Sequence, residues 1–274
     1  MPCRDALSSA ADEKRVRNPT LSVAQRAYAV GLRARYGRTG MPWRIHDVIV
    51  RIDPQVRHLV PHYSEPNLFR FIQQQVAPGE VVLDVGSFLG IYAVLEARGA
   101  GPGGQVIALE PTAWSASIAR RHIAFNADGA APVTVIEAAA GDSPGRADFY
   151  EYDEPYVNSL AAAVDVSGGA TKRSVEVTTI DHVCDGFSIV PTFVRMDVQG
   201  AEFHALRGAR NTIRRAGSRL RIIAEMHPQC WPSFGVDDAS ARDTIASLGL
   251  VAEPLESGAA LFARDSHVVL RPGR

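Results

Sequence analysis

The chain has 274 residues, 46% of them hydrophobic, and its 29 basic residues nearly balance 30 acidic ones. This length allows one substantial core with a small appendage. Near-neutral charge argues against a nucleic-acid partner, because proteins that grip a phosphate backbone usually carry a clear basic excess. No apolar run reaches the length of a membrane span, the first twenty residues lack the apolar segment of a signal peptide, and the three cysteines form no CxxC pair. We therefore expect a cytoplasmic protein.

The N-terminal part is expected to precede the main domain. Residues 1–20 are polar and small and are predicted to form a mobile arm. Between Leu21 and Tyr36 apolar residues recur at helical spacing, which predicts an amphipathic helix. Residues 46–53 alternate like a strand, and residues 55–60 are expected to pair with them across a turn. We interpret residues 21–62 as a cap over the pocket of a domain formed by residues 63–274.

From residue 80 onward, short apolar runs alternate with helical segments. The runs cover 80–85, 105–110, 133–139, 191–198 and 220–227, and the main helices are expected at 91–100, 112–127 and 201–217. This alternation predicts an α/β fold, a Rossmann-like, doubly wound and mostly parallel sheet. Segments 146–152 and 174–180 are expected to be antiparallel. A helix at 241–249, a strand and a hairpin of 260–264 with 267–270 are expected to close the chain.

A glycine-containing turn, DVGSFLG, follows the first run and spans Asp84 to Gly90, with Ser87 inside it. Ligands of open α/β sheets bind at the carboxyl ends of the strands. Gly86 and Gly90 allow a sharp turn and a close approach to a ligand. Asp84 is placed to accept hydrogen bonds from the turn's amides or from a bound ammonium. A dinucleotide site would need GxGxxG for its phosphates, so the acid favours S-adenosylmethionine (SAM), which has no phosphate, over NAD.

Acids also end the next two runs. Glu110 is placed to accept two hydrogen bonds from a ribose diol, and Pro111 ends the strand and starts the next helix. Asp142 is placed to accept the exocyclic amine of adenine, although a turn or helix-capping role is equally open for it.

The candidate catalytic residues are Asp197, Glu225 and His227. Glu225 and His227 alternate in one strand and so point to the same face. A histidine oriented by a carboxylate is a suitable base for an alcohol, while a purely structural strand-end histidine remains the alternative. Glu202 is as well explained as a helix-capping acid. The three candidates are also ligand types for a divalent cation, but no spacing demands one, so we expect no metal.

The strings DVGSFLGIYAVLEA, ALEP, RMDVQGAEFHALRGA and IIAEMHP occur in this order and resemble those of FkbM-type methyltransferases, over roughly residues 63–228. The resemblance implies a class I, SAM-dependent O-methyltransferase, and it places Tyr63 and Glu65 over the cofactor. The family's Asn in the first turn is Phe88 here, its Lys before the Asp is Arg195, and the Glu of its EGAE string is Gln199. These departures leave the ligand contacts and the acceptor open.

The expected function is therefore SAM-dependent methylation of a hydroxyl on a small molecule such as a sugar, glycolipid, macrolide or other secondary metabolite. Two alternatives remain: methylation of a protein or an RNA, and a catalytically inert SAM-binding module, which Phe88 and Gln199 would favour. We expect a small-molecule partner and no nucleic acid. The sequence leaves the oligomeric state open, a homodimer included.

Overall fold

The computed structural model describes residues 23–60, 63, 65–152, 158–160, 171–263 and 265–273. The arm predicted for residues 1–20 lies outside this part of the chain. Within the described part, no helix is both long and apolar enough to cross a membrane.

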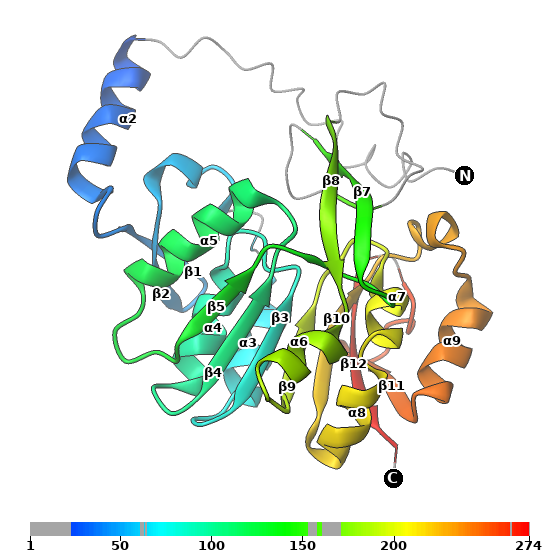
Figure 1. The fold of residues 1–274 in the computed structure, drawn as a ribbon. Helices are drawn as coiled ribbons and strands as arrows, with labels where there is room; N and C mark the ends of the chain where they lie inside the picture. The colour runs from blue at the N-terminus through cyan, green and yellow to red at the C-terminus, as the bar shows by residue number, and fades with distance from the viewer. Residues whose placement is uncertain are drawn as a thin grey trace.

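A seven-stranded sheet forms the centre of the molecule, in the order β11-β12-β10-β9-β3-β4-β5 (Figure 1). The five strands from β10 to β5 run parallel, whereas β12 is antiparallel to both of its neighbours. The predicted doubly wound, mostly parallel α/β sheet is confirmed. The strands are β3 (Val81–Val85), β4 (Gln105–Leu109), β5 (Val133–Ile136), β9 (Phe193–Met196), β10 (Arg221–Met226), β11 (Leu250–Pro254) and β12 (Ser266–Pro272).

Helices cover both faces of this sheet, because successive side chains of its strands point to opposite sides. Val82 and Leu83 are both fully buried, yet they belong to two different hydrophobic clusters. The Val82 cluster packs α3 (Pro66–Gln75), α4 (Ile91–Ala100) and part of α5 (Ala113–Phe125) on one face. The Leu83 cluster packs four helices on the other face: α6 (Ile180–Gly186), α7 (Glu202–Arg207), α8 (Arg210–Ala216) and α9 (Asp238–Ser247).

The N-terminal segment contains the predicted helix, α2 (Val23–Tyr36), followed by a hairpin of β1 (Met41–Ile45) and β2 (Val48–Ile52). The prediction that residues 55–60 pair with residues 46–53 is wrong, since β2 pairs with β1. The chain instead enters a short 3₁₀ helix, η1 (Pro54–Val56), whose first turn is capped by the Asp53 carboxylate accepting from the Gln55 amide at 2.9 Å. An Asp-Pro pair suits such a helix start better than a hairpin turn.

A separate three-stranded sheet of β6 (Ala139–Ala140), β7 (Gly145–Glu151) and β8 (Thr171–Thr178) rises beside the central one (Figure 1). Strands β7 and β8 are antiparallel, as predicted. The run expected at 133–139 is divided, because residues 133–136 pair with β4 and residues 139–140 pair with β8.

Two further expectations are corrected. The C-terminal hairpin is formed by β11 and β12, while residues 260–263 form turns and coil. The helix expected over 201–217 is interrupted between α7 and α8. There the Gly208 carbonyl accepts a hydrogen bond from the Asp181 amide at 2.8 Å, and the Asp181 carboxylate caps the amides of Asn211 and Thr212 in the first turn of α8. These contacts with α6 let one helix end and the next one begin.

Candidate active site

A cavity of about 250 Å³ opens at the carboxyl ends of the parallel strands. The turn after β3 and the end of β4 form one side, the ends of β9 and β10 form the other, and residues of the small sheet complete it. None of its lining residues comes from the described residues 23–60, whose hairpin packs against α5 instead. The division into a cap at 21–62 and a domain at 63–274 stays a prediction.

The turn after β3 brings its backbone to the cavity wall. Gly86 has a φ of 85°, and a Cβ there would lie 1.8 Å from the Asp197 carbonyl oxygen, so this position requires glycine. Ser87 lines the cavity and has a buried hydroxyl oxygen without a hydrogen-bond partner among the described residues. Gly90 lies behind the turn, at the start of α4, where its missing side chain makes room for Ala119.

Glu110 and Pro111 directly follow β4 and line the cavity, and the contact of Glu110 with a ribose stays a prediction. The Glu110 carboxylate accepts from the Phe88 amide at 2.9 Å and from the Thr112 amide and hydroxyl at 3.0 and 2.6 Å. Burial raises the pKa of the Glu110 carboxyl to about 7, although these hydrogen bonds act in the opposite direction. Glu110 is thus rigidly held and titrates close to neutrality.

Asp84 lies fully buried behind the turn, directly opposite Arg195 on the neighbouring strand β9. Its Oδ1 accepts from Arg195 Nη1 at 2.9 Å, so its partner is this guanidinium and not the turn amides that the sequence had suggested. Arg195 also binds Asp197 Oδ2 at 2.9 Å, and its guanidinium carbon lies 4.2 Å from the centre of the Tyr92 ring. The arginine therefore fixes the end of β9 to that of β3.

Asp142 does not reach the cavity. Its carboxylate is 42% exposed and lies 3.1 Å from His204 Nδ1 and 3.7 Å from Arg207 Nε, on α7. The predicted contact between this acid and adenine is not formed by the site as folded, because the chain leaves the central sheet at Ile136, before this residue.

Tyr63 and Glu65 both line the cavity, and their predicted position over the cofactor stays a prediction. The Tyr63 hydroxyl accepts from the Leu89 amide at 3.2 Å, and its ring stacks with that of Phe88 at 6.3 Å between centroids. Glu65 Oε2 accepts a 2.5 Å hydrogen bond from the Tyr92 hydroxyl. These contacts attach the segment before α3 to the turn after β3 and to the start of α4.

The three catalytic candidates meet at the ends of β9 and β10. His227 Nε2 lies 3.6 Å from Glu225 Oε1 and 4.0 Å from Asp197 Oδ1. Asp197 and Glu225 line the cavity, but His227 is only 3% exposed and does not. Its Nε2 contacts the Gln199 amide nitrogen at 3.0 Å, and Gln199 also bonds Asp197. The histidine thus supports the cavity wall from behind.

Glu202 anchors this histidine. The Glu202 carboxylate is fully buried and lies 2.8 Å from His227 Nδ1, while it also accepts from the Gly200 amide at 2.8 Å and from Trp231 Nε1 at 2.9 Å. Burial opposes a charge on His227, yet the carboxylates of Glu202 and Glu225 raise its pKa well above the usual value. Burial together with the charge of Asp197 raises the pKa of Glu225.

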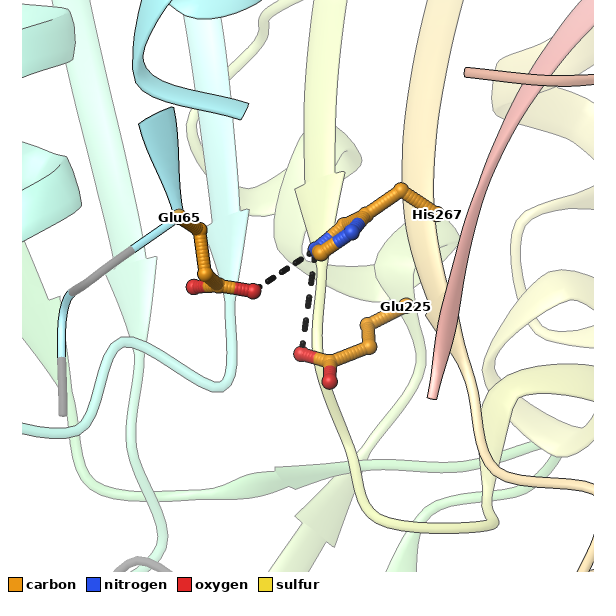
Figure 2. A group of neighbouring side chains, drawn as sticks. All are labelled: Glu65, Glu225 and His267. Atoms are coloured by element: carbon orange, nitrogen blue, oxygen red, sulfur yellow. Dashed lines mark ion pairs between the residues drawn. The ribbon is translucent and has the colours of Figure 1, made fainter. Parts of the chain in front are cut away.

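His267 is the main residue that sequence reasoning missed. It lies on β12 directly opposite Glu225 of β10. Its Nε2 is 3.0 Å from Glu65 Oε1 and 3.9 Å from Glu225 Oε2 (Figure 2). The sequence could have indicated His267 only through the antiparallel pairing of β12 with β10. That pairing depends on the β11–β12 hairpin, which was not the hairpin predicted.

Several solved methyltransferase structures are similar to this chain at low sequence identity. An O-methyltransferase from Thermotoga maritima is 12% identical, with 86% of each chain covered and a TM-score of 0.47. One from Bacillus cereus, in complex with S-adenosylhomocysteine (SAH), is 13% identical, covering 98% of this chain and 96% of that one, with a TM-score of 0.44. A precorrin-6y C5,15-methyltransferase from Geobacter metallireducens is 12% identical, covering 77% and 90%, with a TM-score of 0.44. No curated protein sequence matches significantly.

The sequence profile of the methyltransferase FkbM domain matches residues 84–250, which is more than half of the chain and runs from the end of β3 through β4, β5, β9 and β10. The fold is therefore that of a methyltransferase of the doubly wound α/β type. The chain belongs to the FkbM methyltransferase family. The family implies SAM as the methyl donor.

Proposed function

We propose that the protein transfers a methyl group from SAM to a hydroxyl of a small molecule such as a sugar or another natural product. One observation carries the proposal: a single cavity joins a glycine turn and Glu110 on one side to two carboxylates, Asp197 and Glu225, on the other. The first side suits an adenosyl cofactor, and the second suits an acceptor that must lose a proton.

The residues on the cofactor side fit SAM. Ser87 presents a buried hydroxyl that has no partner among the described residues, as expected of a group that a ligand satisfies. Glu110 is fixed by three donors and faces the cavity, where its free lone pairs would accept the ribose hydroxyls. The acids around the cavity also suit a cofactor that carries a sulfonium and an ammonium.

When bound, SAM would supply an electrophilic methyl carbon, and its sulfur would keep the electron pair of the bond that the new bond to the acceptor oxygen replaces. The protein has to align the acceptor with this carbon, exclude water and receive the hydroxyl proton. Asp197 and Glu225 are the carboxylates that face the acceptor side. His227, bound to Glu202, holds them in place through Gln199 and its contact with Glu225.

Calorimetric titration with SAM, SAH and NAD tests the cofactor half of the proposal. We expect saturable binding of SAM and SAH, loss of both in Glu110→Ala, and full retention in Glu137→Ala, whose half-exposed carboxylate pairs with Arg120 outside the cavity. Binding of NAD alone, or of none of the three, would contradict the proposal.

A turnover assay tests the acceptor half. We expect SAH to form with members of a panel of sugar and macrolide alcohols, and Glu225→Gln to lower kcat by about 100-fold or more, a typical loss for a group that takes up the proton. SAH formation only with RNA or protein acceptors would replace the proposed acceptor. Tight SAM binding without turnover on any acceptor would identify an inert SAM-binding module.

A further inference from the structure

The side chains of Glu65, Glu225 and His267 converge from three separate segments (Figure 2), and Glu65 and Glu225 line the cavity. Glu65 immediately precedes α3, while Glu225 and His267 face each other on β10 and β12. One ligand atom from each of the three lies within 4.8 Å of the other two. We propose that these three side chains bind a divalent transition-metal cation, such as Mn²⁺ or Zn²⁺, beside the acceptor.

The contacts of His267 point to a shared cation more than to a simple ion pair. Its Nε2 is buried and lies 3.0 Å from Glu65 Oε1 and 3.9 Å from Glu225 Oε2, and it has no well-formed hydrogen bond among the described residues. A protonated ring would be expected to direct its hydrogen at one of the two carboxylates. A cation between the three groups would contact all of them at once.

In both Glu65 and Glu225, one carboxylate oxygen contacts another side chain and the second oxygen is directed toward His267. Glu65 Oε2 accepts from the Tyr92 hydroxyl, which leaves Oε1 toward His267. Glu225 Oε1 lies toward His227, which leaves Oε2 toward His267. Outer hydrogen-bond partners of this kind orient the ligands of protein metal sites.

Charge supports the same conclusion. Arg195 is the nearby fixed cation, and it is bound to Asp84 and Asp197. Within ion-pair distance in the described part of the chain, Glu65 has only His267 as a counter-charge, and Glu225 has His267 and the buried His227. An imidazole with two carboxylates is a ligand set for transition metals, whereas Mg²⁺ and Ca²⁺ prefer oxygen ligands alone.

A second possible group, Asp197, Glu225 and His227, is less suited to a metal. Both ring nitrogens of His227 already have partners, in Glu202 and Gln199. Both oxygens of Asp197 are also bonded, to Arg195 and Gln199. The group around His267 has free ligand atoms, so we assign the cation there.

The position of the cation suggests its role, which rests on the proposed function. Glu65 and Glu225 line the cavity, so a coordination position would open toward the acceptor, the arrangement of catalytic metal sites. A cation there would bind the acceptor oxygen and make its proton more acidic. With Glu225 bound to the cation, Asp197, which also lines the cavity, would receive that proton in place of Glu225.

Electron paramagnetic resonance of Mn²⁺ added to the metal-free full chain tests the binding directly. Mn²⁺ is chosen because it favours oxygen and imidazole over thiolate, so the cysteines do not compete. We expect one bound Mn²⁺ per chain, displaced by Zn²⁺, and an affinity lowered by about tenfold or more in His267→Asn and in Glu65→Gln. His182→Asn, which changes an exposed histidine on α6, should bind as the wild type does. Thermal melting followed by circular dichroism verifies that each variant is folded.

No Mn²⁺ binding by the wild type up to millimolar concentration would overturn the proposal. Equal affinity in the wild type and both site variants would overturn it as well, and so would release of Mn²⁺ on saturation with SAM, which would assign this wall to the cofactor's ammonium. Because Mn²⁺ binding is read without turnover, its failure leaves the SAM titration intact, and a failed SAM titration leaves the metal result intact.

Discussion

Glu110 and Glu96 are buried carboxyls in opposite situations. Glu110 faces the cavity and has three hydrogen-bond donors. Glu96, in α4, is fully buried, and neither of its oxygens has a hydrogen-bond partner in the described part of the chain. Burial, followed by the charge of Asp84, raises the pKa of Glu96 well above its usual value. A buried acid without hydrogen-bond partners reduces stability, whereas a hydrogen-bonded acid that faces a cavity is typical of a binding site.

The titration of Glu110 predicts how SAM affinity depends on pH. With a pKa of about 7, the carboxyl is mostly ionised at pH 8 and mostly protonated at pH 6. Because the protonated form loses acceptor capacity toward the ribose hydroxyls, we expect the Kd for SAM to rise by about tenfold from pH 8 to pH 6. Calorimetry at several pH values measures this. Glu110→Gln cannot titrate, so a pH dependence that persists in this variant would assign the effect to another group.

Glu96→Met is predicted to stabilise the protein. Methionine has a similar length and removes a buried polar group, so we expect a gain of about 1–3 kcal/mol in the free energy of unfolding. The pKa of Glu96 is raised in the folded state, so its cost grows as pH rises above the ordinary range of a carboxyl. Urea unfolding should therefore show a larger gain at pH 8 than at pH 5. A loss of stability at both pH values would mean that Glu96 has a partner that the described residues do not include.

At the scale of elements, the turns decide which side chains reach the cavity. The β3 to α4 turn requires Gly86 because the backbone of Asp197 passes beside it. The break between α7 and α8 is likewise set by the contact of α6 with Gly208. In both cases a neighbouring element that is distant in sequence dictates the local conformation.

Gly86→Ala is predicted to destabilise the protein more than Gly79→Ala. The two glycines have φ angles of 85° and 86°, so alanine meets the same backbone strain, about 1–2 kcal/mol, at either position. A Cβ at Gly79 would contact nothing within 4 Å, while one at Gly86 would lie 1.8 Å from Asp197 O. We expect an additional loss of about 1–3 kcal/mol for Gly86→Ala, and weaker SAM binding. Equal unfolding free energies for the two variants would contradict this account of the turn.

At the scale of the whole molecule, the N-terminal hairpin is part of the main core. Ile52 and Val56 belong to the same hydrophobic cluster as α3 and α4. The Asp53 amide donates to His122 Nε2 at 2.9 Å, and the Arg51 amide donates to Asn126 Oδ1 at 2.9 Å, both on α5 or at its end. Helix α2, by contrast, extends away from the sheet (Figure 1) and is mostly exposed.

Two truncations test whether the hairpin belongs to the main core while helix α2 does not. Removal of residues 1–38 should leave SAM affinity within about twofold, because none of the residues lining the cavity comes from the described part of this segment. Removal of residues 1–60 should prevent folding, because it also deletes Ile52, Val56 and other buried side chains worth about 1.5–3 kcal/mol each. Circular dichroism and SAM titration of both variants measure the outcomes. A folded protein that lacks residues 1–60 would show that the hairpin is a separate unit.

Local patterns in the chain were sufficient to predict the alternation of strands and helices, the glycine turn, and the acids at the ends of β4, β9 and β10. Each of these depends on side-chain periodicity or on a residue's position relative to a strand end, and both are readable along the sequence. The resemblance to the family rests on the same segments, which explains why it agreed with the fold.

The tertiary structure decided what periodicity cannot encode, namely which distant segments become neighbours. The register between β10 and β12 places His267 opposite Glu225, and that between β3 and β9 places Arg195 against Asp84. The exit of the chain from the central sheet after Ile136 keeps Asp142 away from the cavity. These contacts are long-range, and their partners are selected by packing and by the pairing of buried charges, because a buried polar group is stable only where the fold supplies its partner.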